Sequence, residues 1–282
     1  MKIVYDVLDP TGNITILVRT PVPEADQPAL AAFLMELEPE TEQVGFLTPG
    51  GSGETGSLAK TAAYDIDLRM AGGEFCGNAS MCAAVIAAME SGQTSRNVNL
   101  RVSGASGTVR AEVSVRPGGD WTGTVDMPQP TAIEEVNLPG AGRLPVVRFE
   151  GISHVILQQE ISRDKAQELA PVWCEALGTD ALGLLFLNQE MSAMTPLVYV
   201  PAAQTLCWEK SCASGTTAVC AWFAAQKAEP HVPSSDEHAP CSICLRQPGG
   251  ELQAEADRSG AIRLIGKVKL LKHAEAEIPA VS

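Results

Sequence analysis

Hydrophobic and polar residues alternate in short runs near the start of the chain and then take up a helical period. β-Branched and apolar residues dominate positions 2–8 and 13–19, and residues 9–12 (DPTG) between them have the composition of a turn. This pattern predicts a β-hairpin. Apolar residues spaced three and four apart then predict a helix over about 27–38, with Asp26 as its cap.

The later segments have mainly the pattern of short strands. Strands are predicted at 43–48, 61–69, 98–103, 107–115, 145–149, 154–158, 183–188, 196–200, 241–246 and 261–270. A second amphipathic helix is predicted over 163–177, capped by Ser162 and closed by Gly178. Residues 126–130 contain two prolines and have the composition of a linker. The polar tail from about 273 is expected to fray.

Two segments differ from this pattern because a cysteine precedes small residues that open an alanine-rich helix. They are residues 75–85 (FCGNASMCAAV) and 211–222 (SCASGTTAVCAW), about half the chain apart. Both predicted helices are apolar almost all round, which indicates that both are buried. The repeat therefore suggests two similar domains, each with a central helix wrapped by strands.

Composition and charge exclude several classes of protein. The chain has 282 residues, of which 45% are hydrophobic and 19% charged, as expected for a globular protein with a core. A net charge of −14 argues against nucleic acid as a partner, because it repels the phosphate backbone. No run reaches the roughly 18 apolar residues of a membrane helix, so no membrane partner is expected. Without a signal-peptide pattern, the eight cysteines are expected to be thiols of a cytoplasmic protein.

A cysteine at the start of a helix has a specific chemistry. Free N–H groups and a partial positive charge at the helix N-terminus favour a thiolate, so the thiol pKa is expected to fall toward neutrality. Small residues after the cysteine let a substrate carboxylate approach the amides. Two such helix ends suit the removal of a proton from one face of a carbon and its return on the other. The alternative for each cysteine alone is an inert buried thiol, which the repeated context disfavours.

Several short motifs resemble those of one enzyme superfamily. Residues 76–79 (CGNA) resemble the Cys-Gly-Asn motif of diaminopimelate epimerase, and residues 209–216 (EKSCASGT) resemble the second cysteine motif, nearer to the proline racemase branch. Residues 12–13 (GN), 42–43 (EQ) and 151–154 (GISH) resemble further motifs that follow in the same order. The resemblance covers nearly the whole chain, and its two cysteine motifs are the specific part.

This resemblance implies a fold and a division of the chain. The expected fold is α/β (α+β), with two pseudo-symmetric domains, each a curved, mostly antiparallel sheet wrapped around a central helix. The final strand returns to the first domain. We therefore expect an N-terminal racemase-like domain made of residues 1–127 and 267–282, and a C-terminal one made of residues 128–266.

The resemblance also implies a racemase or epimerase of amino acids that needs no cofactor and no metal. Carried over to this sequence, Cys76 and Cys212 are the acid–base pair, His154 supports Cys76, and Glu209 supports Cys212 and contacts the substrate amine. The predicted substrate-binding residues are Asn13, Gln43, Gly77, Asn78, Ala213 and Ser214. The expected partners are a small amino acid substrate and, as one option, a second copy of the chain.

Departures from the family pattern bear on the substrate. Ile152 stands where the family has asparagine, Gly183 falls near another expected asparagine, and Lys210 replaces an arginine. A site that lacks hydrogen-bonding groups for the far end of a substrate cannot select for that end. This favours an ordinary amino acid, of which histidine is one candidate, over diaminopimelate. The alternative is a diaminopimelate epimerase proper.

A second alternative is a non-catalytic or zinc-bearing binding module on the same fold. His231, His238, Cys241 and Cys244 have the composition of a zinc site. Their spacing alone is a weak signal, because the two cysteines lie in a predicted strand and the histidines in a loop.

Overall fold

The computed structural model describes residues 2–50, 64–227 and 241–278. It divides into two compact units, Met1–Asp126 with Ile265–Ser282, and Met127–Leu264. The division expected from the sequence had its boundaries after residues 127 and 266. That each unit is a racemase-like domain remains a prediction.

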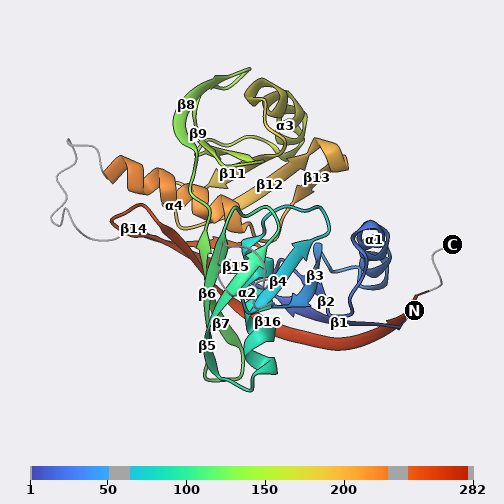
Figure 1. Cartoon of the computed structure of the whole chain (residues 1–282). Helices are drawn as coiled ribbons and strands as arrows, with labels where there is room; N and C mark the ends of the chain where they lie inside the picture. The colour runs from blue at the N-terminus through green and yellow to red at the C-terminus, as the bar shows by residue number, and fades with distance from the viewer. Residues whose placement is uncertain (1, 51–63, 228–240, 279–282) are drawn as a thin grey trace, which may run out of the picture. The chain divides into compact units, whose positions relative to one another are not determined.

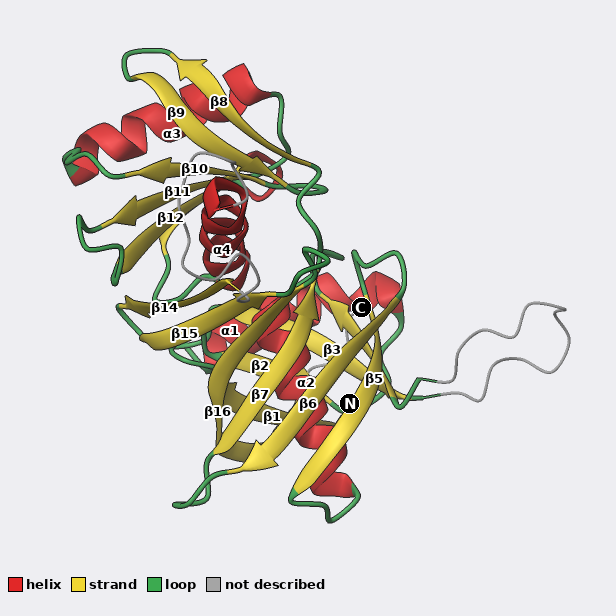
Figure 2. Ribbon diagram, turned by 90° about the vertical axis from the view of Figure 1, so that its left-hand side faces the viewer, coloured by secondary structure: helices red, strands yellow, loops and turns green. Residues whose placement is uncertain are grey.

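In the first unit, strands close into a ring around one helix (Figures 1 and 2). The strands are β1 (Lys2–Asp9), β2 (Thr15–Val18), β3 (Gln43–Pro49), β4 (Ile66–Met70), β5 (Ser95–Val102), β6 (Thr108–Val115), β7 (Trp121–Met127) and β16 (Ile262–Glu277). They neighbour one another in this order, and β16 also pairs antiparallel with β1, which closes the ring. Most pairs are antiparallel, while β2 with β3 and β4 with β5 are parallel.

The helix inside this ring is α2 (Gly77–Glu90), which the first cysteine motif opens. Residues 77–88 are all buried, as its apolar sequence predicts. Small side chains let the strands approach: a β-carbon at Gly123 of β7 would lie 3.0 Å from the side chain of Met81. Outside the ring, α1 (Gln27–Leu37) follows a short 3₁₀ turn, η1 (Glu24–Asp26), and packs Leu30 and Leu34 in a cluster with strands β1 to β3.

The second unit has one six-stranded sheet, one hairpin and two helices. The sheet strands are β8 (Ala132–Leu138), β9 (Gly142–Arg148), β10 (Ser153–Leu157), β11 (Leu182–Leu187), β12 (Met194–Val200) and β13 (Thr205–Trp208), and the hairpin strands are β14 (Cys241–Gln247) and β15 (Gly250–Ala256). A 3₁₀ turn, η2 (Pro201–Ala203), precedes β13. The helices are α3 (Arg163–Leu177) and α4 (Ala213–Lys227).

The two faces of this sheet pack against different helices (Figure 2). Val155 and Leu184 belong to the core cluster of α3, whereas their strand neighbours Ile156 and Leu185 belong to the cluster of α4. Because successive side chains of a strand point to opposite faces, apolar runs at β10 and β11 are buried on both sides. The sheet and the hairpin thus enclose α4 as the central helix of the unit.

Several sequence predictions are confirmed in detail. β1 and β2 form the predicted antiparallel hairpin. Ser162 caps α3 by accepting a hydrogen bond from the amide of Lys165, and Gly178 ends the helix in the left-handed conformation at φ 60°. Asp26 stands at the start of α1, but its side chain makes no capping hydrogen bond.

Other predictions are wrong. The tail does not fray at 273, because β16 continues to Glu277 and pairs with β1 as far as Lys2, where Lys2 and Glu275 form an ion pair. The strand expected over 61–69 begins at Ile66 in the described part of the chain. Strands β7, β8 and β15, which carry several polar residues, and the four-residue β13 were not predicted, and pairing with neighbours makes them strands.

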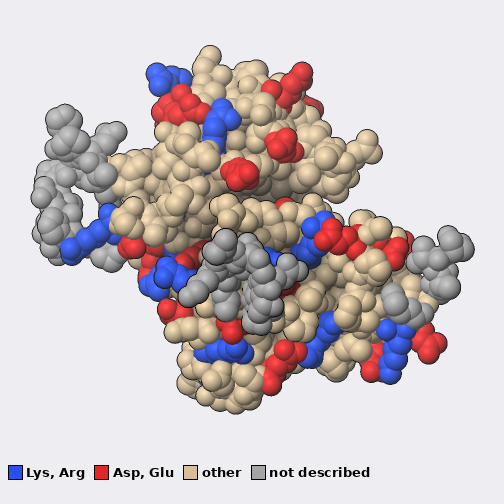
Figure 3. Space-filling model, viewed as in Figure 1, with Lys and Arg blue, Asp and Glu red and all other residues tan. Residues whose placement is uncertain are grey.

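Acidic and basic side chains lie interspersed over the face shown in Figure 3. Ion pairs also link neighbouring strands, such as Arg110 with Asp126 and Arg148 with Glu134. Within the described ranges, no helix has both the length and the apolar character needed to cross a membrane.

Candidate active site

Cys76 stands at the N-terminus of α2 in an extended backbone conformation. Its sulfur accepts a hydrogen bond from the amide of Ala79 at 3.4 Å, so the cysteine itself is the helix cap. The thiol also donates a hydrogen bond to Oε1 of Gln43 on β3, at 3.0 Å. The sulfur is thereby held between the helix end and the neighbouring strand.

A network of amide side chains surrounds this thiol. Nε2 of Gln43 donates to Oδ1 of Asn13 and, at 2.8 Å, to Oγ1 of Thr15. Asn78 donates to the same Asn13 oxygen at 3.1 Å, and Asn13 donates to a carboxylate oxygen of Glu42 at 2.6 Å. Four residues expected from the sequence, Asn13, Gln43, Cys76 and Asn78, are thus joined in one cluster, with Gly77 buried beside them. Glu42, the carboxylate that accepts the hydrogen bond from Asn13, was not among the predicted site residues.

Cys212 precedes α4 in the same manner. Its sulfur accepts a hydrogen bond from the amide of Gly215 at 3.4 Å and lies 3.5 Å from Oγ of Ser214. Glu209 also acts on this thiol, both through its charge and as a hydrogen-bond partner. The predicted residues Glu209, Cys212, Ala213 and Ser214 therefore form a second cluster, within the second unit.

The similarity of the two motifs extends to the residue four positions after each cysteine, which is Ser80 in the first motif and Thr216 in the second. The hydroxyls of Ser80 and Thr216 donate to the carbonyl oxygens of Cys76 and Cys212, at 2.7 and 2.8 Å. The amides of the same two residues donate to the same carbonyls at 3.0 Å. The common spacing Cys-x-x-x-Ser/Thr in the two motifs carries this signal, although it was not singled out from the sequence.

Sequence reasoning also missed Gln247, at the end of β14. This glutamine is 4% exposed, accepts a hydrogen bond from the amide of Cys212 at 2.8 Å, and donates to the hydroxyl of Thr216 at 2.9 Å. It holds the start of α4 from an element that follows the cysteine by about 30 residues. No local motif could reveal it, because only the tertiary structure brings β14 to this helix end.

His154 on β10 is fully buried, and its Nε2 lies 3.0 Å from Oγ of Ser214. Burial lowers the pKa of this imidazole to about 3, so the ring is neutral at pH 7. The family resemblance assigned His154 to Cys76, whereas its hydrogen bond here connects it to Ser214, beside Cys212. Nδ1 has no hydrogen-bond partner among the described residues.

The expected fall of the thiol pKa values is wrong for both cysteines. Burial raises the pKa of Cys76 to about 11, although the amide of Ala79 acts in the opposite direction. Burial, followed by the charge of Glu209, also raises the pKa of Cys212, against the effect of Ser214 and the amide of Gly215. Desolvation outweighs the helix end, so both thiols are protonated at neutral pH.

The proposed zinc ligands do not converge within the described part of the chain. Cys241 and Cys244 lie three residues apart on β14, so their side chains point to opposite faces, one buried and one exposed. His231 and His238 lie outside the described residues. Among the residues that are described, no group of three metal-ligating side chains occurs.

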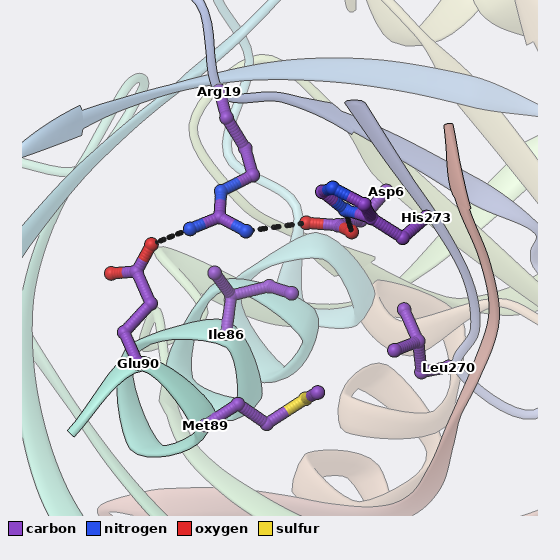
Figure 4. A pocket seen from close by; sticks show the side chains of 7 residues that line it. All are labelled: Asp6, Arg19, Ile86, Met89, Glu90, Leu270 and His273. Atoms are coloured by element: carbon purple, nitrogen blue, oxygen red, sulfur yellow. Dashed lines mark hydrogen bonds and ion pairs between the residues drawn. The ribbon is translucent and has the colours of Figure 1, made fainter. Parts of the chain in front are cut away.

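One cavity lies at the other end of α2 from Cys76 (Figure 4). It has a volume of about 400 Å³ and is lined by Asp6, Arg19, Ile86, Met89, Glu90, Leu270 and His273. Its charged groups pair with one another: Arg19 contacts Glu90 and Asp6, and Nδ1 of His273 lies 2.6 Å from Asp6. A helix of this length spans about 20 Å, so the cavity is separate from the thiol.

Comparison with known proteins decides the family. The sequence profile of the histidine racemase CntK N-terminal domain matches residues 2–275. The chain belongs to this family. The histidine racemase of Fusobacterium nucleatum subsp. nucleatum is 31% identical over 221 residues, which are 75% of this chain and 77% of that protein.

Solved structures share the fold of this family member at low sequence identity. A predicted epimerase from Pseudomonas aeruginosa has a TM-score of 0.67 at 16% identity, over 98% of each chain. A hydroxyproline epimerase from Agrobacterium vitis, solved with bound trans-4-hydroxy-L-proline, has a TM-score of 0.63 at 15% identity, over 97% of this chain and 92% of its own. The predicted fold class is confirmed, and the chain is an isomerase of the racemase and epimerase type. The non-catalytic binding module is therefore set aside.

Proposed function

We propose that this isomerase racemises free histidine, with Cys76 and Cys212 as its two acid–base groups. A thiolate on one side of the α-carbon removes the proton, and a thiol on the other side returns one, which inverts the carbon. Histidine is the substrate named for the curated relative from Fusobacterium nucleatum. The location in the cytoplasm and the homodimer remain predictions from the sequence.

The repeated geometry of the two cysteines carries this proposal. In each unit the sulfur accepts a hydrogen bond from the amide three residues later at 3.4 Å, while a hydroxyl and an amide four residues later hold the cysteine carbonyl. Inert buried thiols have no need of a matched hydrogen-bond set at the start of two separate helices. A mechanism with two equivalent bases requires such a pair.

The neighbouring groups supply the other needs of the reaction. Both thiols are protonated at rest, so one must lose its proton before it can act as a base. In this proposal Glu209, a hydrogen-bond partner of Cys212, takes that proton and also holds the substrate ammonium group. The first amides of α2 and α4, at Gly77, Asn78, Ala213 and Ser214, have no backbone carbonyl acceptor within their own helices and suit a substrate carboxylate. Asn13 and Gln43 hold Cys76 and Asn78 in place for this contact.

The proposed reaction uses no organic cofactor and no metal, because the two thiols themselves supply the acid and the base. We expect full activity of the purified chain with no cofactor added and in the presence of a chelator. The absorption spectrum should have no band of a pyridoxal Schiff base. Loss of activity in the chelator, or such a band, would contradict this part of the proposal.

Hydrogen exchange in heavy water tests the two-base mechanism. Neither Cys76→Ala nor Cys212→Ala should racemise histidine, because the proton cannot be returned on one face. Any exchange that a variant retains should concern one enantiomer only, and the two variants should prefer opposite enantiomers, as read by proton NMR of pure L- and D-histidine. Cys244→Ala, at an exposed thiol, is the matched control and should racemise normally. Near-normal racemisation by either site variant would refute the mechanism, as would exchange of the same enantiomer by both.

A substrate panel separates histidine from the alternatives. Histidine, proline, alanine and diaminopimelate should be compared by loss of optical rotation at equal concentration. We expect the highest kcat/KM for histidine and little turnover of diaminopimelate. Gly183, which falls near an asparagine expected in the epimerase, offers no side chain to a distal group, and the space beside it is taken by His154. Efficient turnover of diaminopimelate alone would make the chain an epimerase proper.

A further inference from the structure

A chain of hydrogen-bonding groups runs from the buried imidazole to the sulfur in the second unit. Nε2 of His154 lies 3.0 Å from Oγ of Ser214, and this oxygen lies 3.5 Å from the sulfur of Cys212. A hydroxyl can donate one hydrogen bond and accept others, so the direction of this chain depends on which groups hold the protons. The surroundings of its two ends fix that direction.

At the sulfur end, the single thiol proton has a stronger acceptor than Ser214. Glu209 is a hydrogen-bond partner of Cys212, and an ionised carboxylate can only accept. The thiol therefore donates to Glu209, and the sulfur meets Ser214 and the amide of Gly215 as an acceptor. Among the described residues, Glu209 is the charged group that acts on the Cys212 thiol, whereas burial lowers the pKa of His154.

At the imidazole end, Nδ1 is fully buried and has no hydrogen-bond partner in the described part of the chain. A buried N–H group without an acceptor is rarer and more costly than a free lone pair. The proton of the neutral ring therefore belongs on Nε2, which donates it to Ser214. Both ends give the same direction: His154 donates to Ser214, and Ser214 donates to Cys212.

We propose that Ser214 is a positioning residue that passes the hydrogen-bond donation of the neutral His154 to the Cys212 sulfur and thereby stabilises its thiolate. His154 then acts through Ser214 and takes up no proton during the reaction. Ser214 was predicted from the sequence to bind substrate, and this proposal adds a role at the Cys212 sulfur. The inference rests on the proposed role of Cys212 as an acid–base group, but its two tests need no turnover.

Nitrogen NMR of the histidine rings tests the direction of the hydrogen bonds from His154 through Ser214 to Cys212. The sequence has four histidines, so the His154 signals in the ¹⁵N-labelled full-length protein can be assigned with His154→Gln. We expect the neutral Nε2–H form of His154 throughout pH 5 to 9. The Nδ1–H form, or a charged ring at pH 7, would overturn the proposal.

Alkylation of the free enzyme tests the effect on the sulfur. A hydrogen bond to a charged group is worth about one to two pKa units, so Ser214→Ala should slow the reaction of Cys212 with iodoacetamide about tenfold at pH 8.5, as read by peptide mapping. Ser214→Thr keeps the hydroxyl and should restore most of the rate. The Cys76 peptide of the same digest is the internal control and should react at an unchanged rate.

The outcomes separate this inference from the proposed function. An unchanged alkylation rate of Cys212 in Ser214→Ala would overturn the inference. If KM for histidine rises in that variant while the alkylation rate is unchanged, the Ser214 hydroxyl serves substrate binding instead. Failure of Ser214→Thr to restore the rate would also overturn it, because the hydroxyl is then not the group that matters. If the expected tautomer and rates are found in a protein that racemises no amino acid, the inference stands and the proposed function fails.

Discussion

Gly183 lies directly opposite His154 in the parallel pairing of β10 and β11, and a β-carbon at Gly183 would lie 2.2 Å from Nδ1 of the imidazole. No side chain fits at this position unless the ring moves. The glycine therefore makes room for the imidazole, which is hydrogen-bonded to Ser214.

Gly183→Ala is expected to lower the free energy of unfolding by about 1–3 kcal/mol, because the added methyl group overpacks a buried ring. The displaced ring should also lower kcat. Urea unfolding and racemisation assays check these two effects. Gly107→Ala is the matched control, since a β-carbon at Gly107 would have no other heavy atom within 4 Å beyond its own chain neighbours. Equal effects of the two substitutions would contradict the prediction.

The buried imidazole makes the protein sensitive to acid. The pKa of His154 is lowered to about 3 in the folded chain. Below about pH 6.5 the imidazole is therefore protonated in the unfolded chain but stays neutral in the folded chain. Stability should therefore fall as the pH falls from about 6.5 toward 3, with a loss of about 2 kcal/mol between pH 7 and pH 5 from this group.

Urea unfolding of the wild type and of His154→Gln at several pH values measures this contribution. The variant lacks the titrating ring, so its stability should change less between pH 7 and pH 5. Parallel pH profiles of the two proteins would show that His154 is not the source of the acid sensitivity.

Gln247 should stabilise the start of α4. In Gln247→Leu, the amide of Cys212 and the hydroxyl of Thr216 lose their partner in a buried position, so the free energy of unfolding should fall by about 1–3 kcal/mol. Gln253→Leu, at a partly exposed glutamine of β15, is the matched control and should change the stability little. The prediction fails if both variants unfold at the same urea concentration.

The pH dependence of Cys76 follows from its burial. With a pKa raised to about 11, its thiolate fraction should increase about tenfold for each pH unit between 8 and 10. The alkylation rate of the Cys76 peptide should follow this increase without a plateau, and kcat/KM should rise with pH over the same range. A plateau of the Cys76 rate below pH 9 would show that the sulfur is a thiolate near neutrality.

Local patterns in the sequence specify much of the fold because they depend on neighbouring residues. Ser162 and Gly178 at the two ends of α3 fix that helix through capping and a left-handed turn. The alanine-rich run after Cys76 specifies a helix buried on all sides. The positions of the two thiols at the starts of α2 and α4 could be predicted in the same way, since each sulfur accepts a hydrogen bond from an amide only three residues later.

The sequence by itself therefore determined the family, the two cysteine motifs and their buried helices. Only the tertiary structure decided that burial raises the thiol pKa values, because desolvation depends on every atom packed around the sulfur. It also decided that Gln247 holds the amide of Cys212 and that His154 meets Ser214, which is 60 residues away in the chain. Strand pairing and sheet packing create such contacts, and no local pattern records them.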